Sequence, residues 1–125
     1  MADSEAPVFD PGLTLVGLDR TGGSRFIESA PGPPPRIDGW VIGAPLMTEN
    51  APHGGEMHPD GDEVLFLVSG HVEVVLEEGG RERRLDLVAG QGLVVPRGVW
   101  HRVVLREPSR LLHITPGPGG EHRPL

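Results

Sequence analysis

Cysteine is absent from the 125-residue sequence, and this absence removes several kinds of chemistry at once. Disulfide frameworks, thiolate-bound zinc, thiol redox chemistry and cysteine nucleophiles are all excluded. Tyrosine is also absent and each of the 11 basic residues is arginine, so lysine Schiff bases, lysine bases and tyrosine acids are excluded as well. Acid–base chemistry therefore falls to the six histidines and the 18 carboxylates.

Positive charge is scarce, because 18 acidic residues outnumber the 11 arginines and give a formal net charge of −7. This sign disfavours the phosphate backbone of nucleic acids and the anionic surface of membranes, so we expect neither as a partner. No apolar run approaches the length of a membrane span, and the first residues lack the basic and apolar regions of a signal peptide. We therefore expect a soluble cytoplasmic protein.

Glycine and proline, by contrast, are abundant, since 19 Gly and 14 Pro make up about a quarter of the chain. Such a share lies near the level at which low complexity or disorder begins, so their distribution decides the interpretation. Residues 1–36 hold many of them, with short apolar runs such as residues 13–18 between, and predict an arm with one or two edge strands. Residues 117–125 are again rich in Gly and Pro and predict a C-terminal tail.

The intervening residues 37–116 carry the pattern of several short strands. The stretch 39–47 is a strand candidate, and from Glu56 to Thr115 valine and leucine are dense. Turn signals divide this region roughly every 6 to 11 residues, as in a β-sandwich or barrel. They are Asp60-Gly61, Ser69-Gly70, Gly79-Gly80, Gly90-Gln91-Gly92 and Pro96-Arg97-Gly98. No segment keeps a helical apolar stripe free of Gly and Pro, so an all-β fold is predicted.

Two segments indicate how the strands are buried. Val72, Val74 and Leu76 alternate with polar residues, which is typical of a half-buried strand. Residues 62–68 are apolar on both faces, so this strand is predicted to be covered on both sides.

Polar residues recur inside this region in a fixed order that resembles the two motifs of the cupin superfamily, G-x5-H-x-H-x(3,4)-E-x6-G and G-x5-P-x-G-x2-H-x3-N. The positions that match in register are His58, Glu63, Gly70, Gly90, Pro96, Gly98 and His101. Three positions depart from the motifs. Asn50 stands at the opening Gly, Glu56 at the first His and Leu105 at the closing Asn.

The resemblance implies an all-β double-stranded β-helix, or jelly roll, that forms a cupin barrel over residues 37–116. The Gly/Pro-rich arm at 1–36 and the tail at 117–125 would flank it. It also implies one divalent metal ion per chain (iron, manganese, zinc or nickel), a small-molecule ligand and a homodimer. The edge strand of the arm is a surface on which the sheet of a second subunit would pair.

The spacing itself explains how the polar residues meet. Residues i and i+2 on a strand share a face, so Glu56 and His58 converge from one strand. The Asp60-Gly61 turn brings Glu63 back to the same side, and His101 arrives from a distant strand. A polar site is therefore predicted at one end of an apolar barrel. Its expected aliphatic lining is Leu65, Leu67, Val95, Val103 and Leu105.

Glu56 has two interpretations. As a ligand it completes a set of two Glu and two His, which suits iron, manganese or zinc. As a solvated rim carboxylate it leaves His58, Glu63 and His101, the two-His-one-carboxylate triad of non-haem Fe(II) oxygenases. His53 would substitute for it if the preceding loop bends inward.

Other residues have structural alternatives. If no metal binds, His58 and His101 would be histidines satisfied by hydrogen bonds at strand ends, and Glu63 would be exposed. His113 belongs either behind the ligands or on the surface, and Arg97 contacts either solvent or an anionic substrate. Trp100, next to His101, is expected to face the opposite side and to serve outer packing or an interface.

The leading functional hypothesis is a metal-dependent small-molecule enzyme in which His58, Glu63 and His101 bind the ion and Glu56 binds it or moves protons. Oxygenase chemistry comes first, and isomerase, lyase or cyclase chemistry next. The alternatives are a non-catalytic cupin that binds a metal or small ligand, and a structural jelly roll whose site is degenerate at Glu56.

Overall fold

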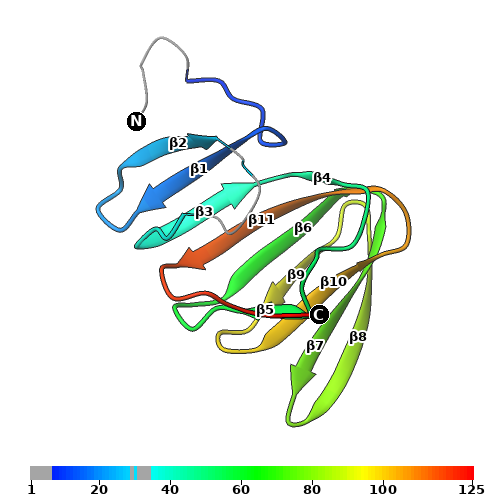
Figure 1. Cartoon of the computed structure of the whole chain (residues 1–125). Helices are drawn as coiled ribbons and strands as arrows, with labels where there is room; N and C mark the ends of the chain where they lie inside the picture. Colours follow the sequence, from blue (N-terminus) through cyan, green and yellow to red (C-terminus); the bar gives the residue numbers. More distant parts are fainter. Residues whose placement is uncertain (1–6, 29, 31–34) are drawn as a thin grey trace.

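The structure, a computed structural model, describes residues 7–28, 30 and 35–125 (Figure 1). The parts of the expected arm at residues 1–6, 29 and 31–34 lie outside these described residues. Among the described residues no helix is long and apolar enough to cross a membrane. Their strands are β1 (Thr14–Asp19), β2 (Ser24–Glu28), β3 (Gly39–Gly43), β4 (Leu46–Met47), β5 (Gly55–Met57), β6 (Glu63–Ser69), β7 (His71–Glu78), β8 (Arg81–Val88), β9 (Gly92–Val95), β10 (Trp100–Leu105), β11 (Ser109–Gly117) and β12 (Glu121–Arg123).

The strands form two antiparallel sheets. One sheet has seven strands in the order β2-β1-β3-β11-β6-β9, with β4 paired to β11, and the other has five in the order β12-β5-β10-β7-β8. Figure 1 shows the β1–β2 pair at one side of the molecule and the β7–β8 hairpin at the other. Sheet neighbours such as β11 and β6 are far apart in the chain, as in a jelly roll. The predicted all-β jelly-roll fold is confirmed.

Alternation explains why β7 is half buried. Val72, Val74 and Leu76 are almost completely buried, as their pattern predicts. They belong to a core cluster between the two sheets. The other buried members of that cluster are Leu65, Leu67, Leu87, Val95 and Leu111. Burial of one aliphatic side chain contributes about 1.5–3 kcal/mol, so this cluster provides a large share of the hydrophobic stabilisation.

Strand β6 differs from the prediction that both of its faces are covered. Glu63, Leu65 and Leu67 face the interior and are buried. Val64, Phe66 and Val68 face outward and are 38%, 40% and 46% exposed. The prediction of full coverage is therefore wrong for the single chain, because no described element packs over the outer face of β6.

The turn between β6 and β7 is locked against β11. Gly70 has φ +96°, and a Cβ at this position would lie 2.1 Å from Ser109 Oγ. Ser109 is fully buried, and its oxygen accepts a hydrogen bond from the His71 N–H at 3.0 Å. Only glycine satisfies both the backbone angle and the close approach, which accounts for the glycine at this motif position.

Two of the three departures from the motifs contact each other. The side-chain Oδ1 of Asn50 accepts a hydrogen bond from the Leu105 backbone N–H at 2.8 Å. The segment before β5 is thereby attached to the end of β10. Since both strands contribute to the polar end of the barrel, this bond helps to fix their relative position.

The last nine residues include a strand that the sequence pattern does not reveal. Strand β12 pairs with β5, and Gly54 N–H donates to the Arg123 carbonyl at 2.8 Å. The Arg123 guanidinium lies 3.9 Å from the Trp100 ring centroid and pairs with Glu77. Trp100 thus packs against β12 and does not line the cavity described below, consistent with its expected outer position.

Candidate metal centre

Strand register places three polar residues in one row. Glu56 of β5 is directly paired with His101 of β10 on one side and with His122 of β12 on the other. Directly opposed residues in antiparallel strands project to the same face of the sheet, with Cβ atoms about 5 Å apart. His58 follows Glu56 by two residues and reaches the same side. The five-stranded sheet and the residue directly after β5 therefore supply three of the four predicted metal ligands.

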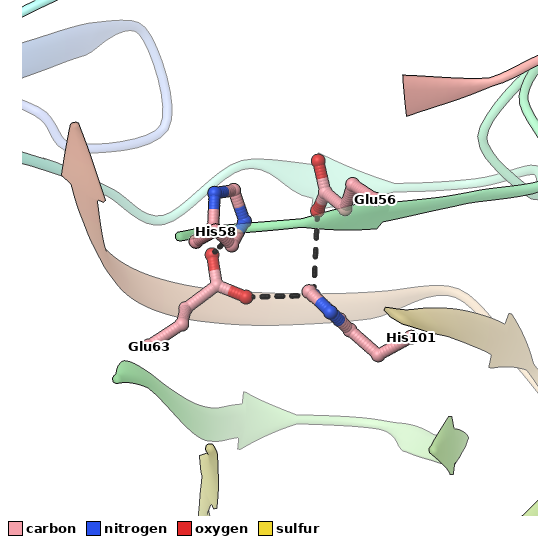
Figure 2. A group of neighbouring side chains, drawn as sticks. All are labelled: Glu56, His58, Glu63 and His101. Atoms are coloured by element: carbon pink, nitrogen blue, oxygen red, sulfur yellow. Dashed lines mark ion pairs between the residues drawn. The ribbon is translucent and has the colours of Figure 1, made fainter. Parts of the chain in front are cut away.

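The fourth predicted ligand comes from the other sheet. Glu63 opens β6, and its carboxylate points toward His58 and His101 (Figure 2). Potential donor atoms of Glu56, His58, Glu63 and His101 all lie within 4.8 Å of one another. We call these four residues the inner cluster. The structure therefore brings together every residue of the predicted ligand set.

A turn in the second motif holds the loop that carries His58. Gly98 N–H donates to the His58 carbonyl at 3.0 Å, and Arg97 N–H donates to Asp62 Oδ1 at 2.8 Å. The Arg97 guanidinium donates to the Pro59 carbonyl at 2.9 Å. Arg97 does not line the cavity, and its contacts fasten this loop.

The inner cluster is closely spaced. His101 Nε2 lies 2.8 Å from Glu63 Oε1 and 3.7 Å from Glu56 Oε1, and His58 Nε2 lies 3.4 Å from Glu63 Oε2. In an octahedral ion with bonds of about 2.1 Å, neighbouring ligand atoms are about 3.0 Å apart and opposite ones about 4.2 Å. The separations in the inner cluster are close to these values, so the residues fit a single divalent ion.

Burial gives an independent reason to expect an ion. His58, Glu63 and His101 are 6%, 3% and 2% exposed. His58 Nε2, Glu63 Oε1 and His101 Nε2 are buried and have no hydrogen-bond partner of acceptable geometry, although two of them are only 2.8 Å apart. Buried polar atoms without partners are costly. A cation between these three atoms would satisfy all of them.

The tautomer of His101 suits ligation. Its Nδ1 lies 3.3 Å from the Val99 carbonyl, which is an acceptor, so Nδ1 carries the proton. The lone pair is then on Nε2, the nitrogen that faces the inner cluster. Metal-binding histidines are commonly oriented by such a hydrogen bond from the second ring nitrogen.

A hydroxyl group orients Glu63. Thr115 Oγ1 donates to Glu63 Oε2 at 2.6 Å, which commits its only proton. His113 Nδ1, at 2.8 Å, must therefore donate to the Thr115 oxygen. This resolves the position of His113, which lies behind a predicted ligand and lines the cavity. Its Nε2 then carries the lone pair.

Burial and pairing act in opposite directions on the charges of the cluster. Burial raises the pKa of the Glu63 carboxyl, but pairing with His101 and His58 outweighs it and holds that pKa well below its usual range. Burial lowers the pKa of His101, and Glu63 more than reverses this, so that pKa lies above its ordinary value. The ionised Glu63 therefore attracts a proton onto His101 or, in its place, a metal cation.

The inner cluster opens into a cavity of about 300 Å³ between the two sheets. Leu65 and Val103 line it as predicted, and aliphatic side chains form most of the remaining wall. Leu67, Val95 and Leu105 do not line it and instead belong to the core or pack against it. The prediction that these three residues line the cavity is therefore wrong, because the barrel interior below Leu65 is filled by side chains.

Glu56 lies at the open side of the inner cluster and is 29% exposed, unlike the three buried members. His53 and His122 line the cavity beside it. Sequence reasoning missed His122 and Thr115 as residues near the site. His122 lies on a three-residue strand with no periodic signal, whereas the i+2 spacing of His113 and Thr115 places both on the face of β11 toward Glu63.

Comparison with known proteins agrees with the fold. The family model described as Cupin domain matches residues 47–115, more than half of the chain. A solved structure of Bacillus subtilis oxalate decarboxylase, studied for its Mn(II) centres, has a TM-score of 0.58 and 20% identity, covering 68% of this chain and 24% of its own. This chain thus spans about a quarter of that enzyme's length.

Other similar folds serve different chemistry. An oxalate oxidase structure has a TM-score of 0.55 and 18% identity, covering 66% of this chain and 45% of its own. Peruvianin-I, a cysteine peptidase from Thevetia peruviana latex, has a TM-score of 0.58 and 15% identity. The match covers 70% of this chain and 57% of the Peruvianin-I chain. No curated protein matches the chain. At these identities the structures show the fold alone.

Replacement of Thr115 tests the orientation of Glu63. Thr115→Val removes the hydroxyl donor but keeps the side-chain shape, and we expect about 10- to 100-fold weaker binding of Mn(II), measured by calorimetry. Thr115→Ser keeps the donor and is expected to bind nearly as tightly as the wild type. Equal affinities in the Val and Ser variants would show that this hydrogen bond does not orient a ligand.

Proposed function

This chain belongs to the cupin domain family, and from that premise we propose that it binds one divalent metal ion in the inner cluster and acts on a small molecule in the adjacent cavity. The observation that carries the proposal is the convergence of buried nitrogen and oxygen atoms that lack other partners. Two imidazoles and two carboxylates form a donor set that suits manganese, iron, zinc or nickel. The Mn(II) centres of the similar oxalate decarboxylase support this range.

The cavity supplies the binding surface for an organic molecule. Ile37, Val41, Met47 and Leu111 provide apolar wall, and the inner cluster provides the polar end. A cavity of about 300 Å³ is at the small end of the usual range for ligand sites. We therefore propose a small, partly apolar ligand with an oxygen-bearing group directed toward the cluster.

Two residues are placed to handle protons. Glu56 is half-buried at the cavity wall, so its carboxylate reaches both a bound molecule and bulk water. Burial lowers the pKa of His113, so its imidazole is neutral near pH 7 with a lone pair on Nε2. Glu56 is proposed as the proton carrier, and His113 as an acceptor within the cavity.

Oxygenase chemistry is the first proposal for the reaction. A bound ion would supply Lewis-acid or dioxygen activation. His58, Glu63 and His101 make up a two-His-one-carboxylate set, and Glu56 is the most exposed of the four residues, so a bound ion would be accessible from the cavity on the side of Glu56. If Glu56 also binds, fewer positions stay open. That case favours an isomerase, lyase or cyclase, in which one substrate binds without dioxygen.

Metal binding is tested on protein purified without chelator. We expect a stoichiometric divalent metal by elemental analysis, and a higher melting temperature when Fe(II), Mn(II), Zn(II) or Ni(II) is added to metal-free protein. A ligand at 100 times its Kd stabilises the fold by about 2.7 kcal/mol. His101→Ala should remove the tightly bound ion, whereas Glu56→Ala should only weaken it.

His71→Ala is the matched control, because His71 pairs with Asp86 on β8 and lies outside the cavity. It should bind metal as the wild type does. If no metal co-purifies and no added ion raises the melting temperature, the metal proposal is wrong. Unchanged affinity in Glu56→Ala would place Glu56 on the rim.

Oxygen consumption separates the reaction classes. The iron-loaded wild type is expected to consume dioxygen with at least one member of a panel of phenolic, dicarbonyl and thiol compounds. His101→Ala, which lacks the ion, should consume none above background. Uniform inactivity of a fully iron-loaded protein would remove oxygenase chemistry and leave the isomerase and binding alternatives.

We also propose that the protein is a homodimer. The outer face of β6 is apolar and continues across β11, because Phe66 pairs with Leu112 and Val64 with Ile114. Val94 of β9 continues the same face and is 54% exposed. A two-fold interface joins identical patches, so this exposed apolar sheet face would pack against the same face of a second copy.

Light scattering tests the oligomeric state. The wild type should have the mass of two chains, and Phe66→Glu should shift it to one chain because the charge would be buried in the interface. Glu82→Gln on the exposed end of β8 serves as the control and should remain dimeric. A monomeric wild type at micromolar concentration would contradict the proposal.

A further inference from the structure

A second group of potential donors lies beside the inner cluster. His53, Glu56 and His122 each offer one atom, and these atoms all lie within 4.8 Å of one another. We call these three residues the outer cluster. We propose that it binds a second divalent ion, joined to the first through the carboxylate of Glu56. This goes beyond the single ion proposed above and depends on that proposal only for the inner half of the bridge. Because Glu56 then binds the inner ion, the bridge corresponds to the case that favours an isomerase, lyase or cyclase, and Glu56 does not act there as the proton carrier.

The carboxylate of Glu56 is divided between the two clusters. Its Oε1 lies 3.7 Å from His101 Nε2, and its Oε2 lies 3.3 Å from His122 Nε2. Figure 2 shows the carboxylate at the edge of the inner cluster, with one oxygen directed toward His101. A carboxylate has two oxygens and can bind two ions, whereas a neutral imidazole has one lone pair. The glutamate that departs from the motif therefore permits a bridge that histidine would not.

His122 is held in place by the pairing of β12 with β5. It is directly opposite Glu56, and the flanking Arg123 is fixed by Trp100 and Glu77. The side chain of His122 is 40% exposed, so an ion bound there would keep water ligands. Little rearrangement is needed, because Nε2 already faces the carboxylate.

His53 completes the set from the loop before β5. Its ring packs edge-on to His122, with the centroids 5.2 Å apart. Its Nδ1 accepts a hydrogen bond from the Gly55 N–H at 3.1 Å, so Nδ1 carries the lone pair and would be the ligating atom. The ion would replace this hydrogen bond, and because Gly55 is buried the loss of its partner is a cost that lowers the affinity of the outer cluster.

Charge limits the affinity of the outer cluster. The two clusters together contain two carboxylates, Glu56 and Glu63, and their two negative charges do not fully balance the four positive charges of two divalent ions. Bridged ions in such sites lie about 3.5–4 Å apart and repel each other. The outer ion should therefore bind more weakly than the inner one and should leave first on dilution or chelation. All three outer residues line the cavity, so the ion would lie at its wall.

The test is a titration of metal-free full-length protein with Mn(II), followed by calorimetry and electron paramagnetic resonance. The wild type should bind two equivalents, the second at least about tenfold more weakly. The spectrum of an isolated Mn(II) ion should give way to that of an exchange-coupled pair as the second equivalent fills. His122→Ala and His53→Ala should each bind only the first equivalent, with uncoupled Mn(II).

Two further variants separate the clusters. His101→Ala should lose the tight equivalent and retain the weak one, and His71→Ala should retain both. A wild type that binds one equivalent, lost in His101→Ala and kept in His122→Ala, overturns the outer site but leaves the proposed function intact. Two equivalents without exchange coupling overturn the bridge, and two equivalents in His122→Ala overturn the assignment of the ligands. A wild type that binds no Mn(II) overturns the outer site, whereas the first proposal fails only if Fe(II), Zn(II) and Ni(II) do not bind either.

Discussion

The charge of one buried carboxylate governs the polar end of this barrel. Glu63 is almost completely enclosed at the start of β6, and an ionised carboxylate in such a place needs compensating partners. His58 and His101 face it from the opposite sheet, and Thr115 donates a hydrogen bond from the neighbouring strand. The strand ends, the motif turn and the register of β5 and β10 all serve to bring these groups to Glu63. The aliphatic core below them supplies the rigidity that keeps their positions fixed.

Much of this arrangement could be predicted from the sequence because the motif spacings encode strand geometry. The i+2 relation of Glu56 and His58, and the turn before Glu63, place these residues on one side without any structural information. The domain boundaries stay a prediction. Strand β12 could not be predicted, since three residues give no periodicity and its pairing with β5 is set by long-range packing. His122 was missed for the same reason. Sequence also cannot say what covers an apolar face, which is why the exposure of Phe66 was not foreseen.

Glu56 has both a structural and a chemical role in the site. Its place between β10 and β12 makes it the neighbour of both His101 and His122. A histidine in this place would bring the motif closer to its usual form, but it would leave the cavity wall without a half-exposed carboxylate. The substitution at this position therefore does not by itself indicate a degenerate site. It places an oxygen donor where the motif has a nitrogen donor, and carboxylate ligands suit ions such as manganese.

The position of β11 in the middle of the larger sheet affects the order in which the chain folds. Strands β3 and β6 have no partner on their facing edges until residues 109–117 have been synthesised, because β11 lies between them. During translation the residues that precede Ser109 can form hairpins but not a closed interior. Thr115 lies on this same late strand. The addition of β11 thus completes the larger sheet and brings Thr115 to Glu63 in one event, so the hydrogen bond that orients this carboxylate forms only when the sheet is complete.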